Sequence, residues 1–228
     1  MNYISKVKTT WANSMSKKFY PLYFFLSSVA FLVTLNISCK VLAACQNRSG
    51  VLLNDFIINV TTPIDFSLPI FIIIYTCTLL VVFTNLQNAE KFFRGLQAYT
   101  LLILLRTLSI YLVPLEPPID IIILDDPIAN YLLGDDENIV TKDLFFSGHV
   151  SALVLLGLAS QSEVLKKFNF VFAAVVGVLI VWQHVHYTVD VVVAPVIAYA
   201  CVYAIEAIHE WIEKFNFASA DIGSSSFD

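Results

Sequence analysis

Two histidines and an aspartate at helical spacing could carry out phosphoryl chemistry. His186 and Asp190 are four residues apart, so on a helix they share one face, and the carboxylate can hold one ring nitrogen while the other faces a substrate. His149 opens an apolar run after a Ser-Gly pair, Ser147 and Gly148, where free backbone N–H groups favour phosphate. Arg106 would supply a fork of donors to phosphate oxygens. One histidine could attack phosphorus while the other protonates the leaving oxygen.

Each of these residues also has a structural explanation. An arginine in an apolar run can snorkel or pair with an aspartate. A His-x-x-x-Asp pair can bind a metal, but two histidines and one carboxylate with no further acidic residue in a span disfavour zinc. We therefore expect no metal and no cofactor. His184 and Tyr187 are expected to support the site rather than to react.

Composition points to a membrane protein. Hydrophobic residues make up 58% of the 228-residue chain, the mean hydropathy is +0.76, and 14% of residues are charged. A soluble domain has about a quarter of its residues charged. The net charge of −5 argues against a nucleic-acid partner. Cys39, Cys45, Cys77 and Cys201 are scattered without a metal-binding spacing.

Six apolar segments predict an all-α, polytopic membrane protein with six transmembrane helices, since only helices or closed barrels satisfy the backbone in lipid. A basic arm at 1–20 precedes the six-helix catalytic domain at 21–208, whose motifs occupy about 106–200. The tail at 209–228 is expected to be partly disordered. The predicted spans are Pro21–Val41, Phe66–Phe83, Leu96–Val113, Phe145–Ser160, Phe168–His184 and Tyr187–Ile208.

Lysine and arginine predict the orientation, because they accumulate in cytoplasmic segments. Most lie in the N-terminal arm, the second and fourth loops and the tail, so both termini are expected in the cytoplasm. Alternation of the spans then brings Arg106, the Ser-Gly-His run and the His186–Asp190 pair to the extracytoplasmic or lumenal ends of helices three, four and six. The acidic loop on that side contains Ile119–Leu124 and Ile128–Leu133, apolar enough for short helices on the membrane surface.

At these residues the sequence resembles the type-2 phosphatidic acid phosphatase superfamily, and most closely its sphingomyelin synthase branch. The second motif of that branch resembles Asp143-Leu144-Phe145-Phe146-Ser147-Gly148-His149, and the third resembles His184-Val185-His186-Tyr187-Thr188-Val189-Asp190-Val191. Its arginine segment resembles the run from Arg106 to Pro117. Together these motifs extend from about Arg106 to Ala200.

The resemblance implies roles for these residues. His186, oriented by Asp190, would become a phosphohistidine, and His149 would protonate the departing diacylglycerol and then deprotonate the incoming alcohol. Arg106, Ser147 and Gly148 would bind phosphate, with Asp143 supporting them. Members of this branch move phosphocholine or phosphoethanolamine from a glycerophospholipid to ceramide without metal.

Departures from the superfamily pattern bear on the branch. The phosphatase form has an arginine six residues before the third-motif histidine, where this chain has Ile180, and a lysine where it has Tyr99. Both absences favour the synthase branch. Thr141-Lys142 and Pro195-Val196 instead depart from that branch.

Three hypotheses follow for the function. The first is a phosphotransferase that moves a head group from a phospholipid donor to ceramide or a diacylglycerol-like lipid. The second is a lipid phosphate phosphatase that uses water; a dry, lipid-accessible pocket favours transfer and a water-filled one hydrolysis. The third is a non-catalytic lipid-binding or transport protein, in which alanine at His149 and His186 leaves function intact. The donor, the acceptor and the oligomeric state stay open.

Overall fold

Helices make up nearly all of the regular structure in a computed structural model that describes residues 2–126 and 141–224, with side chains to residue 214. Asn2, Asn88, Ser147 and Ser162 each cap a helix with a side-chain oxygen. In chain order the helices are α1 (Tyr3–Met15), α2 (Tyr20–Gln46), α3 (Phe56–Val60), α4 (Ser67–Asn85), α5 (Ala89–Leu112), α7 (Gly148–Ala159), α8 (Glu163–Trp182) and α9 (Thr188–Ser224).

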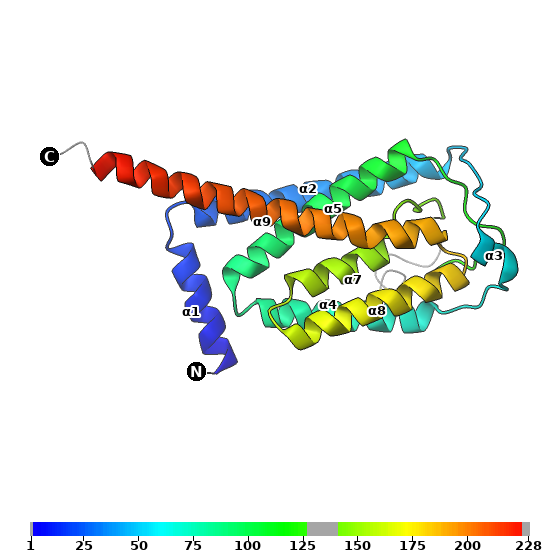
Figure 1. Cartoon of the computed structure of the whole chain (residues 1–228), viewed down its shortest axis with the longest axis horizontal. Coiled ribbons are helices and arrows are strands. Elements are labelled where there is room, and N and C mark those ends of the chain that lie inside the picture. The colour runs from blue at the N-terminus through cyan, green and yellow to red at the C-terminus, as the bar shows by residue number, and fades with distance from the viewer. Residues whose placement is uncertain (1, 127–140, 225–228) are drawn as a thin grey trace.

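The long helices run side by side, and α1 crosses one end of the bundle (Figure 1). Over the described residues, five helices are long and apolar enough to cross a membrane: α2, α4, α5, α8 and α9. The all-α, polytopic membrane fold is thus confirmed. The fourth predicted span differs, because α7 has 12 residues and is about 18 Å long, whereas the hydrocarbon core is about 30 Å thick.

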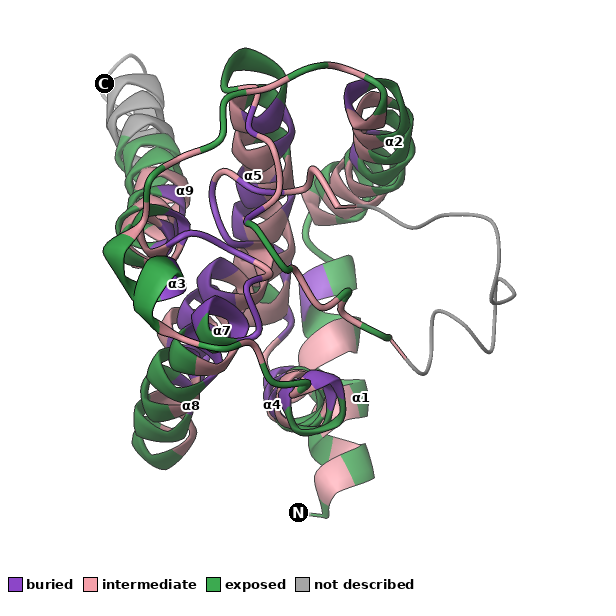
Figure 2. Ribbon diagram, turned by 90° about the vertical axis from the view of Figure 1, so that its right-hand side faces the viewer, coloured by how far each residue is buried: buried purple, intermediate pink, exposed green. Residues whose placement is uncertain are grey.

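The short helix α7 forms the centre of the bundle. It packs against α4, α5, α8 and α9, and Figure 2 shows it as the most buried helix in the view onto one end. Val150, Leu153 and Leu155 are each at most 2% exposed. Because neighbouring helices surround α7, this helix need not be long enough to cross the hydrocarbon core. Hydropathy alone could not distinguish this buried helix from a span.

Several helices extend beyond their predicted ends, α5 and α9 by the most. α5 begins at Ala89 rather than Leu96, because Asn88 caps it and Arg94 forms ion pairs with Glu206 and Glu213 of α9. α9 continues to Ser224, so the tail at 209–228, predicted to be partly disordered, has a helical backbone as far as residue 224. Residues 225–228 lie outside the described chain. Charged helix ends carry no hydropathy signal, so the predicted spans were shorter than the helices.

The end of the bundle that holds α3 and the starts of α7 and α9, here called the motif end, is covered by three connecting segments. This cap comprises residues 47–66, 113–126 and 141–147. Val51 exchanges backbone hydrogen bonds with Pro114 (2.9 Å) and Glu116 (3.0 Å), and the Glu116 carboxylate accepts bonds from Gly50 N and Lys142 Nζ. The predicted surface helix at Ile119–Leu124 is wrong: this stretch is not helical, and Ile122 bonds to the backbone and side chain of Gln183. Residues 128–133 lie outside the described chain.

Acid is expected to open the cap. Hydrogen bonds from Lys142 and Gly50 lower the pKa of Glu116, and those from Ser67 lower the pKa of Asp65. A carboxyl group with a lowered pKa stabilises the fold above its unfolded value and loses that contribution as the pH falls through the folded value. Amide exchange in residues 47–66, corrected for its intrinsic pH dependence, should be constant from pH 7 to 5 and accelerate below the ordinary values of 3.8 and 4.5. Acceleration already between pH 7 and 5 would contradict this prediction.

Candidate active site

The start of α7 places a glycine against an arginine. Ser147 is the N-cap of α7, and its hydroxyl accepts a bond from Val150 N. The N–H groups of Gly148 and His149 belong to the first turn, where an α-helix has no partner of its own for them. A Cβ atom on Gly148 would lie 2.7 Å from Cζ and Nε of Arg106. Glycine is therefore the residue that lets a guanidinium lie against the start of this helix.

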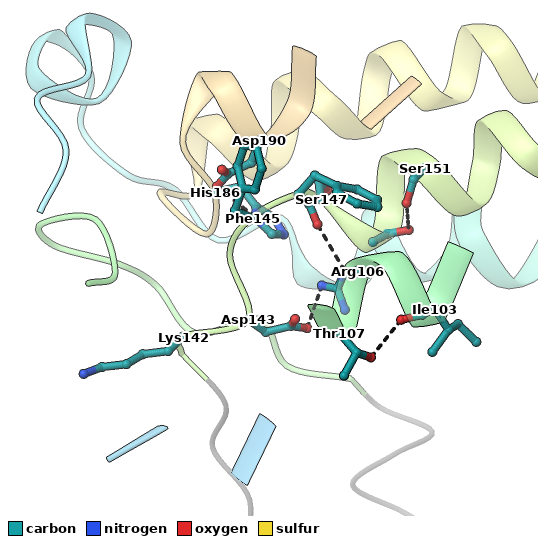
Figure 3. Close-up of polar contacts among 12 residues, drawn as sticks. Ile103, Arg106, Thr107, Lys142, Asp143, Phe145, Ser147, Ser151, His186 and Asp190 are labelled. Carbon is teal, nitrogen blue, oxygen red and sulfur yellow. Dashed lines mark hydrogen bonds and ion pairs between the residues drawn. The ribbon is translucent and has the colours of Figure 1, made fainter. Parts of the chain in front are cut away.

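Arg106 reaches this place from α5 and is held by two groups. Its Nη2 lies 2.7 Å from Oδ2 of Asp143, and its Nε donates to the carbonyl oxygen of Phe146 at 3.1 Å. In Figure 3 the guanidinium of Arg106 points to the loop before α7, whereas the side chain of Lys142 points away from it. Lys142 instead pairs with Glu116 in the cap. Arg106 is thus the fixed cation at the start of α7.

The His186–Asp190 pair forms at the start of α9. Nδ1 of His186 lies 3.3 Å from Oδ2 of Asp190, and the same oxygen accepts a bond from Tyr187 N at 3.0 Å. Because a carboxylate can only accept, this pair places the ring proton on Nδ1 and leaves the lone pair on Nε2. Ser147 N donates to the carbonyl oxygen of Asp190 at 3.1 Å, which ties the starts of α7 and α9 together.

The two histidines face each other across this junction. Their ring centroids are 6.2 Å apart with an interplanar angle of 68°. Nδ1 of His149, Oδ1 of Asp143 and Oδ1 of Asp190 are buried, and within the described chain none of them has a hydrogen-bond partner. Such atoms are costly unless a ligand or water satisfies them. Their position around the two rings suits a bound polar group.

A cavity of about 230 Å³ borders Arg106, Asp143 and His149. Its other walls come from α2, α4, α5 and the first two turns of α7: Ser38, Ile74, Tyr99, Leu102, Ile103, Gly148, Ser151 and Ala152. His186 and Asp190 do not line it and are 1% and 0% exposed. The cavity is therefore lined by three helices of membrane-spanning length and by α7, whereas the second histidine is buried and outside its lining.

His184 and Tyr187, predicted to support the site, both contact the cap. The His184 ring lies between Ile119 O (2.9 Å) and Thr61 Oγ1 (3.1 Å), and its φ of 60° turns the chain back after α8. The Tyr187 hydroxyl donates to Glu116 O at 2.9 Å. Asp143, the third such residue, contacts Arg106 directly. Of the three, Asp143 is thus the one that borders the cavity.

Two residues near the site, one buried and one half-buried, were not predicted from the sequence. Asp55 bonds to Thr188 at the start of α9, and Gln183 bonds to Phe66, Ser67 and Ile122. Neither belongs to a motif, and each acts on segments far away in the sequence. Asp55 carried one local signal, since an aspartate before a short apolar run is a typical helix cap.

The arrangement can perform nucleophilic and acid–base chemistry on phosphorus. It combines a histidine with a defined tautomer, a second histidine 6.2 Å away and a fixed guanidinium at a helix start. In the described part of the chain, no group of three or more His, Cys, Asp or Glu side chains is placed to hold a metal ion. The roles of the individual residues stay predictions.

Comparison with known families agrees with this chemistry. Residues 142–207 match the family model described as PAP2 superfamily C-terminal. The matched region contains Asp143, the Ser-Gly-His run and the His186–Asp190 pair, but not Arg106. No curated protein was found to match the chain.

The match supports the type-2 phosphatidic acid phosphatase superfamily, whose members are generally phosphatases and phosphotransferases. It thereby supports an enzyme of this general kind in the membrane.

Proposed function

We propose that this chain is a membrane lipid phosphotransferase of the sphingomyelin synthase kind, which moves a phospho-head-group from a glycerophospholipid to ceramide or a similar lipid alcohol. The observation that carries the proposal is the access to the site. The cavity beside His149 is lined by residues of α2, α4, α5 and α7, and the side chains of His186 and Asp190 are at most 1% exposed. Such a site admits a lipid more readily than bulk water, which favours transfer over hydrolysis.

Charge around the cavity favours a zwitterionic donor. The guanidinium of Arg106 is already paired with Asp143, so the pair has no net charge before substrate binds. A phosphomonoester such as phosphatidic acid would bring close to two negative charges, while a phosphocholine or phosphoethanolamine diester brings one with a compensating cation. Among the described residues, nothing bonds to the buried Oδ1 of Asp143, and a carboxylate oxygen can only accept, so this atom suits a cationic or hydroxyl-bearing group.

The reaction would proceed in two displacements. Nε2 of His186 attacks phosphorus; the bond from phosphorus to the diacylglycerol oxygen breaks, and that oxygen takes its electron pair and a proton from His149. In the second step His149 accepts the proton of the ceramide hydroxyl, whose oxygen attacks phosphorus, and the bond to His186 breaks. Arg106 and the N–H groups of Gly148 and His149 would stabilise the charged oxygens throughout.

The test is a product assay in liposomes. Purified protein is incubated with phosphatidylcholine or phosphatidylethanolamine labelled in the head group, with and without ceramide, and separately with phosphatidic acid. Label in a ceramide product supports the proposal, and no transfer combined with free phosphate from phosphatidic acid replaces it by the phosphatase. If folded protein gives no product from any donor, both enzymes are excluded and a non-catalytic lipid-binding role is left.

We further propose that both termini are cytoplasmic and that the motif end faces the lumen or the cell exterior. Lys6, Lys8, Lys91 and Lys166 belong to α1 or to helix starts at the end of the bundle opposite the motif end (Figure 1). This asymmetry is the one expected for cytoplasmic segments. A thiol introduced at Phe56, which is 77% exposed, should react with a membrane-impermeant reagent that is added to sealed cells, or to vesicles whose lumenal side faces outward. A thiol at Ile4, 63% exposed, should not; the reverse pattern would contradict the orientation.

A further inference from the structure

We infer that Asp55, in the first segment of the cap, is a positioning residue for the His186–Asp190 pair. Its Oδ2 accepts a bond from Thr188 N at 2.7 Å, and its Oδ1 accepts one from Thr188 Oγ1 at 3.0 Å. Thr188 lies midway between the two residues of the pair in sequence. The carboxylate thus fixes the backbone between them from an element 133 residues away.

Asp55 is itself held firmly. It is the N-cap of α3, and its Oδ1 also accepts bonds from Ile57 N at 3.0 Å and Ile58 N at 3.5 Å. Burial opposes ionisation, but the bonds from Thr188, Ile57 and Ile58 outweigh it and lower the pKa of the carboxyl below its ordinary 3.8. Asp55 is therefore ionised at neutral pH and accepts from donors at the starts of both α3 and α9.

In the described part of the chain, hydrogen bonds from other segments reach residues 186–190 through Asp55, Ser147 N and the Tyr187 hydroxyl. Within their own segment, His186 N bonds to Ile180 O, and Tyr187 N bonds to the Asp190 carboxylate. Ser147 N and the Tyr187 hydroxyl add contacts to α7 and to the cap. Asp55 satisfies both donors of Thr188, at the position where α9 begins and its N–H groups lack helical partners. Loss of this bond would let the first turn of α9 fray. The ring of His186 would then no longer be held in one direction.

The chain offers a matched control in Asp65, which lies in the same segment of the cap. Its Oδ1 accepts bonds from Ser67 N and Ser67 Oγ at the start of α4, the same pattern on a helix that carries no catalytic residue. Asp65→Asn therefore loosens the same segment of the cap without removing a bond to α9, and so separates the Asp55–Thr188 bonds from general opening of the cap.

The first measurement does not depend on the proposed function. In Asp55→Asn, the amides of residues 187–190 should exchange with deuterium about tenfold faster than in the wild type, whereas Asp65→Asn should leave them unchanged. Unchanged exchange in Asp55→Asn, or equal acceleration in both variants, would overturn the inference.

The second measurement rests on the proposed phosphotransfer. Asp55→Asn should lower kcat about 10- to 100-fold with KM unchanged, because a misplaced reacting group is costly while the donor cavity is untouched. Thr188→Val, which keeps the backbone N–H, should lower kcat less than Asp55→Asn does. The double variant should have the same kcat as Asp55→Asn alone. A raised KM with normal kcat, or additive losses, would contradict a positioning role. If wild-type protein has no activity, the proposed function fails while the exchange result still decides on Asp55.

Discussion

His186→Ala is expected to abolish head-group transfer, with a loss of about 10⁴-fold or more, because it removes the nucleophile that would form the covalent intermediate. The paired His149→Ala should behave differently. General acid catalysis contributes about 10² to 10⁴-fold, and it is dispensable when the leaving group needs no proton. With p-nitrophenylphosphocholine as donor, His149→Ala should still release p-nitrophenolate in a burst, and His186→Ala should not.

The covalent intermediate gives a direct control for this experiment. After alkaline quenching, which preserves phosphohistidine, label from the head group should be found on the wild type and on His149→Ala but not on His186→Ala. If label is found on His186→Ala but not on His149→Ala, then His149 is the nucleophile and His186 the general acid. Its absence from all three proteins during active turnover would point to direct transfer.

Gly148→Ala is the second substitution with a large expected effect. The added methyl group would lie 2.7 Å from Cζ and Nε of Arg106, far inside van der Waals contact. The guanidinium must move, which breaks its bond to Phe146 O and displaces its charge from the start of α7. Loss of a preorganised donor typically costs 10² to 10³-fold in kcat, so we expect about a 100-fold loss in the liposome assay.

Gly95→Ala supplies the control on α5, the helix that carries Arg106. A Cβ atom there would meet Ala159 Cβ at 3.6 Å, an ordinary contact, and alanine is the better helix former. This variant should keep full activity and equal or greater thermal stability. Wild-type activity in Gly148→Ala would show that Arg106 is not needed at the place where the structure holds it.

The helical membrane fold follows from local sequence. Long apolar runs cannot remain in lipid without satisfying their backbone, and only helices do so within one segment. The ends of the helices were harder to predict from the sequence. Helices α5 and α9 extend through charged turns, which are stabilised by the ion pairs of Arg94 with Glu206 and Glu213. Those pairs join residues more than a hundred positions apart, so no local window contains them. For the same reason the centrality of α7 could not be read from its apolar composition.

The candidate site also has a part that could be predicted from the sequence and a part that could not. Residue type and spacing singled out His149, His186, Asp190 and Arg106, because ionisable groups in apolar runs are costly and demand an explanation. Their spacing predicted His186 and Asp190 on one helix face, but α9 begins at Thr188, so His186 lies just before the helix and its ring meets the Asp190 carboxylate from there. The partners that complete the site come from elsewhere: Asp143 neutralises Arg106, and Asp55 holds Thr188.

By itself, then, the sequence determined that this is a helical membrane protein with histidines and a carboxylate suited to phosphoryl chemistry. Only the folded chain shows how the site is enclosed, with His186 buried and His149 beside a cavity between α2, α4, α5 and α7. The physical reason is that periodicity and polarity act over a few residues of one helix. Access, charge balance and capping depend on atoms from several helices and loops that meet only when the chain has folded.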